Sequence, residues 1–346
     1  MPPAPSRFLV TPVHDRATWD GLVRQLGGHP LQLWGWGEVK ETGPWRAHRL
    51  QVTSADRTVG VAQVLVRHLP LPFRALCYVP RGPAVAPVDP AAEVGYGVGD
   101  EALRAGVAEA VATWCHRNVG GVGISFEPDW PEGTSLPVTG AIRGEQPILL
   151  PSTIVLDLTR TPDELMAAMS RTTRADVRNG GREVEIRRVT DEDEVRAVLQ
   201  VYRETAEHAG FALHDPEYYL SIHRLLGDAS VLVAAFHDGR PCSFVWDVMS
   251  GSTAFELYGG VDEVGRKARA NAPVKWFAIR LAQDAGLLRY DVNGLLNDGI
   301  STFKRSFAKH EDQLVGTVDV PFSPLYRLWV QAVPLAKRVV RAVRRA

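Results

Sequence analysis

The order of strand and helix patterns in the first half of this sequence recurs in its second half. In each half a strand precedes a capped helix, two strands follow, and a helix leads into a last strand. The predicted elements are 5–12, 16–27, 46–53, 59–68, 101–118 and 120–130, then 183–189, 191–208, 230–237, 241–249, 272–285 and 287–294. Tyr78 and Tyr258 hold equivalent places, 180 residues apart. Although such elements recur in any α/β protein, the shared order predicts two related domains of mixed α/β structure.

The length of the chain agrees with two domains. At 346 residues it exceeds what a single hydrophobic core usually serves. We expect a first domain over 1–150 and a second over 151–316.

Composition excludes several classes of protein. The 39 basic and 40 acidic residues give a net charge of -1, which argues against a non-specific nucleic-acid coat. The three cysteines lack CxxC spacing and lie in apolar stretches, so we expect core thiols in a reducing compartment. The N-terminus does not resemble a signal peptide, and no apolar run reaches the ~20 residues of a membrane span. A cytoplasmic location is expected, with peripheral contact at the inner membrane face as an option.

Two basic segments stand out. Thr161, Pro162 and Glu164 form a capping box, and Asn179-Gly180 marks a stop, which predicts one helix between them. On one face of this helix lie three arginines, which indicate a solvated surface or a phosphate contact: Arg171, Arg174 and Arg178. Residues 335–346 form a basic amphipathic pattern that fits a docked helix, an anionic membrane surface or RNA phosphates.

Motifs for common chemistries are missing. The sequence has no Walker loop, no G-x-S-x-G, no HExxH and no metal-ligand spacing among its ten histidines, so no metal is expected. One hairpin carries acidic residues instead. A type II′ turn at Gly251-Ser252 would place Asp247 opposite Glu256, a pair that needs protonation, a substrate cation or a basic neighbour.

The stretch LQLWGWGEVK, residues 31–40, places Trp36 and Lys40 four positions apart on one helical face. We expect Trp34 and Trp45 in the core, because large aromatic residues near strand starts usually lie there. Trp36 and Lys40 would then form the lip of a binding site.

Four short motifs in order resemble the FemABX family of tRNA-dependent peptidyltransferases: LQLWGWGEVK, YVPRGPAV, MSRTTRADVRNGGREVEI and YDVNGLLNDGISTFKRSF. The resemblance covers essentially the whole chain. It implies two tandem GNAT-like acyltransferase domains, with 317–346 returning to the first, and it fits members without a long helical arm. The implied activity moves an amino acid from aminoacyl-tRNA to the stem peptide of a peptidoglycan precursor, lipid-linked (lipid II) or UDP-linked (UDP-MurNAc-peptide).

The same resemblance assigns roles to single residues. Lys40 would meet the precursor diphosphate, and Lys304 would lie at the reacting centre beside Phe303, which packs the loop that positions it. The other residues implied to contact substrate are Trp36, Arg81, His214, Tyr218 and Tyr258, and the arginine stripe would contact tRNA. Ala212 and His214 replace a threonine and an arginine of the family pattern, which leaves the acceptor open.

Because aminoacyl-tRNA carries an activated ester, the reaction needs alignment and an oxyanion partner and no cofactor. Lys304 would hold the oxyanion, or else only anchor its loop through backbone carbonyls, and Asp247 or Glu256 could accept the amine proton. Three alternatives stay open: a tRNA-dependent transferase for a small peptide, an acyl-CoA N-acyltransferase, and a non-catalytic membrane-associated binding protein. CoA is disfavoured because Ala268, Ala270 and Ala272 stand where a pyrophosphate turn needs glycines. The sequence gives no oligomeric state.

Overall fold

A computed structural model describes residues 8–87, 101–134 and 138–332 of the chain. The chain divides into two compact units: unit 1 comprises 1–26, 43–151 and 314–346, and unit 2 comprises 27–42 and 152–313. The division differs from the expected one in one segment, since 27–42, with the tryptophan stretch, groups with unit 2. The predicted basic segment 335–346 lies outside the described residues.

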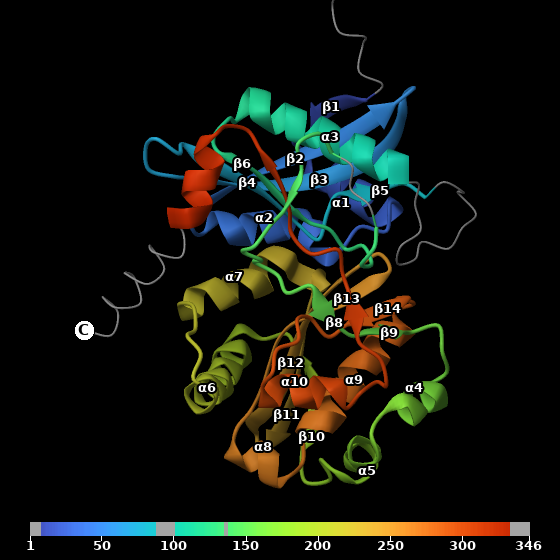
Figure 1. Ribbon diagram of the computed structural model, residues 1–346. Coiled ribbons are helices and arrows are strands. Elements are labelled where there is room, and N and C mark those ends of the chain that lie inside the picture. Colours follow the sequence, from blue (N-terminus) through green and yellow to red (C-terminus); the bar gives the residue numbers. More distant parts are fainter. Residues whose placement is uncertain (1–7, 88–100, 135–137, 333–346) are drawn as a thin grey trace, which may run out of the picture. The chain divides into compact units, whose positions relative to one another are not determined.

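Unit 1 is built on one sheet with the strand order β1-β2-β3-β4-β6-β16-β7, and β5 pairs with β3 (Figure 1). Its strands are β1 (Leu9–Pro12), β2 (Trp45–Ser54), β3 (Arg57–His68), β4 (Ala75–Pro80), β5 (Ala84–Val85), β6 (Gly123–Glu127), β7 (Ile142–Arg143) and β16 (Val318–Pro321). Its helices are α1 (Arg16–Gln25), capped by Asp15, and α3 (Glu101–Asn118). Valines of β2 and β3 and the apolar side of α3 form its core.

Unit 2 has a sheet in the order β10-β11-β12-β13-β14-β9 and a small sheet of β8 and β15. Its strands are β8 (Ser152–Thr153), β9 (Val155–Asp157), β10 (Glu185–Val189), β11 (Ser230–His237), β12 (Arg240–Ser250), β13 (Thr253–Val261), β14 (Arg289–Asp291) and β15 (Asp312–Gln313). Its helices are η1 (Pro30–Gln32), α2 (Trp34–Glu41), α4 (Pro162–Ala168), α5 (Arg171–Asn179), α6 (Glu192–Ala209), α7 (Pro216–Leu226), η2 (Gly227–Ala229), α8 (Glu263–Lys267), α9 (Asn271–Asp284) and α10 (Gly299–Arg305).

The two large sheets share one topology. In each, four strands run antiparallel in chain order, the next strand lies parallel to the fourth, and a further strand pairs antiparallel with that one; in unit 1 the short strand β7 is added beyond it. Tyr78 lies on β4 and Tyr258 on β13, the fourth strand of each sheet. The prediction of two related domains of mixed α/β structure is thereby confirmed.

Several local predictions need correction. The helix expected from Thr161 to Asn179 is two helices, because Met169 leaves helical geometry and Ser170 caps a new helix, α5. Helices α7 and α10 were not predicted, although Asp215-Pro216 and Asp298 mark their starts. Phe303 therefore sits on a helix and not on a loop. Trp34 and Trp45 are only half-buried, whereas Trp36 is buried.

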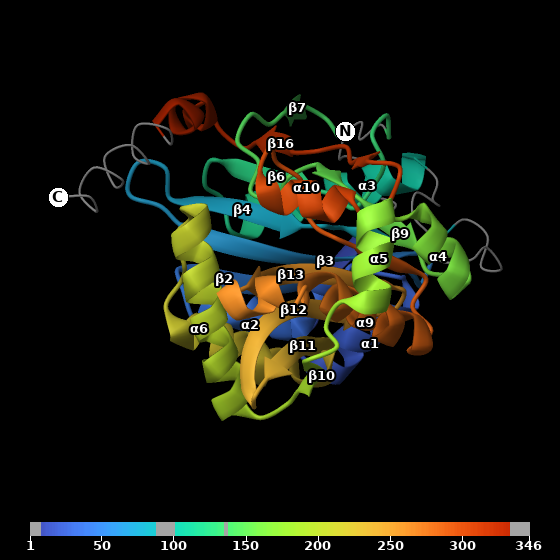
Figure 2. The same ribbon diagram turned by 90° about the horizontal axis from the view of Figure 1, so that it is seen from below.

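The sheet of unit 2 is covered on both faces (Figure 2). Helix α6 packs on β12 and β13 from one side, and α9 packs on β11 and β12 from the other. The α9 face holds a core of small and branched residues that includes Val245, Ala254, Val274 and Ala278. All three cysteines of the chain are free and buried, as expected of core thiols.

Candidate functional site

The parallel strands β13 and β14 of unit 2 separate soon after they pair. Their register ends at Phe255 and Asp291, while β13 continues to Val261. In open α/β sheets, ligands bind where parallel strands diverge at their carboxyl ends. Glu256 and Tyr258 follow the last pair on β13, and Asn293 follows on the chain after β14. This divergence therefore marks the candidate site.

Lys40, Trp36, Tyr218, Tyr258 and His214 form one group in unit 2, which we call the lysine–tyrosine group. The Lys40 ammonium donates a 2.6 Å hydrogen bond to the Tyr218 hydroxyl and lies 4.3 Å from the centroid of the Trp36 ring. Tyr218 also bonds to Tyr258. The exposed imidazole of His214 packs against Tyr218, with ring centroids 4.3 Å apart. Five residues from three separate segments of the chain thus meet in one place.

Burial lowers the pKa of Lys40 to about 8. The ammonium remains charged at neutral pH, where it is a half-buried cation with only aromatic and hydroxyl neighbours among the contacts described for it. Such a cation attracts an anionic ligand more strongly than a fully solvated lysine does. The buried Trp36 supports it from below, since residues four apart share a face of α2. Trp36 is therefore a buried support of the group and does not form the exposed rim of a binding site, as the sequence had led us to expect.

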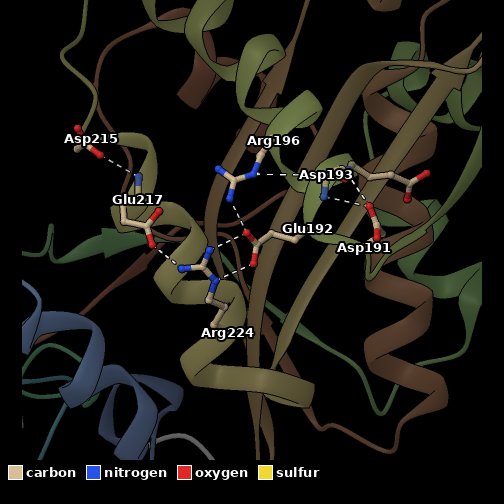
Figure 3. Close-up of polar contacts among 8 residues, drawn as sticks. Asp191, Glu192, Asp193, Arg196, Asp215, Glu217 and Arg224 are labelled. Atoms are coloured by element: carbon tan, nitrogen blue, oxygen red, sulfur yellow. Dashed lines mark hydrogen bonds and ion pairs between the residues drawn. The ribbon is translucent and has the colours of Figure 1, made fainter.

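Helix α7, which carries Tyr218, is tied to α6 by an exposed ionic network (Figure 3). Arg224 bonds to Glu192 Oε1 at 2.6 Å and also to Glu217, and Arg196 binds the same Glu192. The arginines lower the pKa of Glu192 to about 2. The N-cap aspartates Asp191 and Asp215 hold the first turns of the two helices. The network therefore adds a surface link between α6 and α7, the helix that carries the tyrosine bonded to Lys40.

A bulge in β13 turns Glu256 and Tyr258 toward opposite faces of the sheet. The register shifts between Trp246, which faces Tyr258, and Asp247, which faces Glu256, so Leu257 is the extra residue. Tyr258 packs on Tyr202 of α6, whereas Glu256 reaches Lys275 of α9. The hairpin register predicted from Gly251-Ser252 is confirmed, and Gly251 has a φ of +55° as the turn requires.

Asp247, Glu256, Lys275 and Tyr290 form a second group, which we call the buried ionic group. Their exposed fractions are 0%, 6%, 1% and 0%. Lys275 Nζ lies 2.9 Å from Glu256 Oε2, as an ion pair without an aligned hydrogen bond. The Tyr290 hydroxyl lies 2.9 Å from Asp247 Oδ1 and 3.2 Å from Glu256 Oε2. A basic neighbour therefore balances the facing carboxylates, one of the three solutions that the sequence left open.

The buried surroundings affect the acidity of Asp247. Burial and, after it, the charge of Glu256 raise the pKa of Asp247 well above its usual range. The Tyr290 hydroxyl is the donor toward both carboxyl groups, with Asp247 Oδ1 and Glu256 Oε2 as acceptors. Both carboxyl groups are buried and engaged, which argues against direct proton acceptance from a bound amine.

Lys275 and Tyr290 were missed in the sequence. A lysine within the apolar pattern of α9, next to Val274 and one turn before Ala278, was the available signal. A charged residue in such a place is rarely buried unless it is paired. Tyr290 offered no comparable signal, because a tyrosine in a short strand is an ordinary core residue.

Lys304 is half-buried at the end of α10. Its ammonium donates long hydrogen bonds to the carbonyls of Asn293 (3.3 Å) and Gly294 (3.4 Å). Bonds of this length are weak. The contacts fit the loop-anchoring alternative, and they also leave the ammonium free to reorient toward a ligand. Burial is the main cause that lowers the pKa of Lys304.

Other predicted residues lie elsewhere. Arg81 belongs to unit 1, is 2% exposed and donates a 3.0 Å bond to the Leu150 carbonyl. Near it, Glu127 accepts bonds from the Tyr78 hydroxyl and the Ile148 amide at 2.5 and 2.6 Å. The equivalent divergence in unit 1 is thus filled by the chain itself, which argues against substrate contact by Arg81.

The three arginines of the predicted stripe differ in their contacts. Arg174 donates to the carbonyls of Ala167 (3.2 Å) and Met169 (2.6 Å), which are orphan acceptors at the end of α4. One guanidinium nitrogen of Arg174 is thus engaged at the end of α4, and contact of the stripe with tRNA stays a prediction. Arg171 and Arg178 are exposed on the same face of α5.

The turn before α9 is covered within unit 2. The Gly181 amide donates to the Ala268 carbonyl at 2.9 Å, and a Cβ at Gly180 would lie 2.6 Å from the Arg269 carbonyl oxygen. Ala270 and Ala272 are buried. Backbone amides in this turn are poorly placed to receive a pyrophosphate.

Across the described residues, no group of three or more His, Cys, Asp and Glu side chains could hold a metal ion. Nor does any helix within 8–87, 101–134 and 138–332 have both the length and the apolar character of a membrane span.

Comparisons with known proteins agree with this architecture. A family model described as an acetyltransferase (GNAT) domain matches residues 167–305. The lipid II:glycine glycyltransferase of Staphylococcus aureus is 22% identical, with 92% of this chain and 94% of the relative covered. A crystal structure of FemX matches with a TM-score of 0.80 at 19% identity, covering 92% of this chain and 100% of that one. The chain is therefore an acyltransferase of the GNAT fold and a homologue of the lipid II:glycine glycyltransferase, which confirms its resemblance to the FemABX family.

Proposed function

We propose that this protein transfers an amino acid from aminoacyl-tRNA to an amine on the stem peptide of a peptidoglycan precursor, either lipid-linked or UDP-linked. The observation that carries the proposal is the pair of half-buried lysines, Lys40 and Lys304, joined to the diverging strands of unit 2. Homology to a lipid II:glycine glycyltransferase over 92% of the chain supports the substrate class.

Lys40 binds the precursor diphosphate in this proposal. Its ammonium is charged at neutral pH and half-buried, and Tyr218, Tyr258 and His214 line its surroundings. Tyrosine hydroxyls and an imidazole can donate further hydrogen bonds to phosphate oxygens. Lys40 binds substrate and transition state alike, so it contributes mainly to affinity.

Lys304 acts at the reacting centre. The acceptor amine attacks the ester carbonyl, a C–N bond forms, and the carbonyl oxygen becomes an oxyanion. The C–O bond to the tRNA ribose then breaks, and the proton lost by the amine ends on the ribose oxygen. The Lys304 ammonium stabilises the oxyanion, and Phe303, which packs against Phe307 with ring centroids 5.3 Å apart, orients the helix that carries it.

The two lysines approach from opposite faces of the sheet, since Tyr258 faces α6 and Glu256 faces α9. A precursor that contacts both would pass the ends of β13 and β14, with its diphosphate on the α7 side and its stem peptide on the α10 side. Arg171 and Arg178 contact tRNA phosphates, and 335–346 adds affinity for an anionic membrane at the cytoplasmic face.

A mixed pool of charged tRNAs tests the proposal. The protein is incubated with the pool and with lipid II or UDP-MurNAc-pentapeptide, and mass spectrometry detects an added aminoacyl residue. Product should disappear after ribonuclease treatment. An acyl-CoA N-acyltransferase is the second candidate, because the family model describes an acetyltransferase domain. Ribonuclease-resistant product that requires acyl-CoA would establish it instead, and precursor binding without turnover would indicate a binding protein.

A further inference from the structure

The ammonium of Lys275 lies directly beneath the helix that carries Lys304. Its Nζ is 5.7 Å from the ring centroid of Phe303 and 5.1 Å from that of Phe307. Phe303 and Phe307 pack edge to face and bracket Lys304 in the sequence. Cation–π contacts of this kind gain strength when they are desolvated, and Lys275 is 1% exposed. Lys275 is therefore an internal support for this end of α10.

The opposite side of Lys275 is occupied by Glu256. The ion pair is 2.9 Å long and both side chains are buried. Tyr290, whose hydroxyl lies 3.2 Å from Glu256 Oε2, and Asp247, which faces Glu256 across the hairpin, complete the surroundings of Glu256. Breaking such a pair by removal of one partner leaves an uncompensated buried charge.

We propose that Lys275 is a positioning residue for Lys304: its ammonium, paired with Glu256 and enclosed by the rings of Phe303 and Phe307, supports the end of α10 and sets the electrostatic surroundings in which Lys304 works. The inference rests on the proposed role of Lys304 in acyl transfer. Lys275 is buried in α9, so it would act on Lys304 without contacting the substrate.

The charges that face Lys304 come from four elements. Glu256 on β13, Asp291 on β14 and Asp298 at the start of α10 raise the pKa of Lys304, while burial and Lys275 on α9 lower it. Glu256 and Lys275 thus act in opposite directions on the pKa of Lys304 and partly offset each other. Removal of either partner alone should shift the pKa of Lys304, upward when Lys275 is removed and downward when Glu256 is removed.

The test measures how fast Lys304 is acetylated by trace acetic anhydride from pH 6 to 11, with mass spectrometry of the peptide that contains it. Lys275→Met should move the midpoint of the reactivity curve to higher pH, and Glu256→Gln should move it to lower pH, each on the order of one pH unit. The double variant Lys275→Met/Glu256→Gln should return close to the parent. Lys267→Met, an exposed α8 control, should leave the midpoint unchanged.

A purely structural role predicts another pattern. If loss of Lys275 only loosened the packing, water would reach Lys304 and the double variant would stay shifted upward like Lys275→Met. That result, or an unchanged midpoint in both single variants, would overturn the proposal. If Lys275→Met does not fold, the midpoint of the Lys304 reactivity curve must still be at lower pH in Glu256→Gln than in the double variant. Equal midpoints in these two variants would count against the inference.

The labelling assay uses no tRNA and no precursor. A parent protein without transferase activity would therefore refute the proposed function and leave the Lys275 inference standing, provided that the opposite shifts are observed. Where transfer is detected, Lys275→Met should lower kcat with little change in KM, and Lys275→Arg should recover part of kcat because it keeps the charge.

Discussion

The charge of Lys40 is expected to lower the free energy of unfolding of the protein at neutral pH. Burial lowers its pKa from 10.5 to about 8, and a shift of this size corresponds to a cost of about 3 kcal/mol for holding the charge at pH 7. Lys40→Met removes the charge and keeps most of the apolar stem. It also removes the hydrogen bond to Tyr218, which contributes about 1 kcal/mol. The variant should therefore be more stable than the parent by about 2 kcal/mol at pH 7.

The pH dependence gives the sharper test. The folded state releases the Lys40 proton near pH 8 and the unfolded state near 10.5, so the unfolded state binds more protons between these values. Parental stability rises relative to Lys40→Met across that window, because the cost of the buried charge disappears. The advantage of the variant should be complete below pH 8 and should be lost by about pH 10.5, with a total change of about 3 kcal/mol.

Urea unfolding at pH 7, 9 and 10.5 measures the difference, and other titrating groups cancel because they are common to both proteins. Lys267→Met removes an exposed ammonium instead of a half-buried one and serves as the matched control. A Lys40→Met protein less stable than the parent at pH 7, or a difference independent of pH, would refute the reasoning. In the transfer assay the same variant should raise KM for the precursor and leave kcat nearly unchanged.

Three further predictions follow from the same geometry. Lys304→Ala should lower kcat by ~10²-fold or more with an unchanged circular dichroism spectrum, whereas lower thermal stability with full kcat in the folded enzyme would assign Lys304 to loop anchoring. Arg171→Gln/Arg178→Gln should reduce tRNA affinity and flatten the plot of log Kd against log salt by roughly two units, and an unchanged slope would mean a solvated face. Arg224→Ala should lower stability slightly at low salt, since it removes the ion pairs of Arg224 with Glu192 and Glu217, and the loss should shrink in 0.5 M NaCl, as thermal scans at both salt concentrations would reveal.

Local signals in the sequence predicted several elements of unit 2. Asp191 caps α6 as predicted, and the Gly251-Ser252 turn sets the register that brings Asp247 opposite Glu256. Caps and turns depend on residues within a few positions of one another, so their geometry can be read from sequence. The capping box at Thr161 is present as well, but the break at Ser170 depends on a bond from its amide to the Ser306 carbonyl. That bond spans 136 residues, which no local pattern encodes.

The candidate site itself divides in the same way. The sequence determined that Trp36 and Lys40 share a helical face and that two carboxylates face each other in a hairpin. Only the tertiary structure decided that Lys40 meets Tyr218 across 178 residues and that Lys275 pairs with Glu256. It also decided that Arg174 donates hydrogen bonds to carbonyls at the end of α4. Burial and long-range pairing arise when separate elements pack, and they set the charge of each group. For that reason the residue types could be read from the chain, while their ionisation and roles depended on the fold.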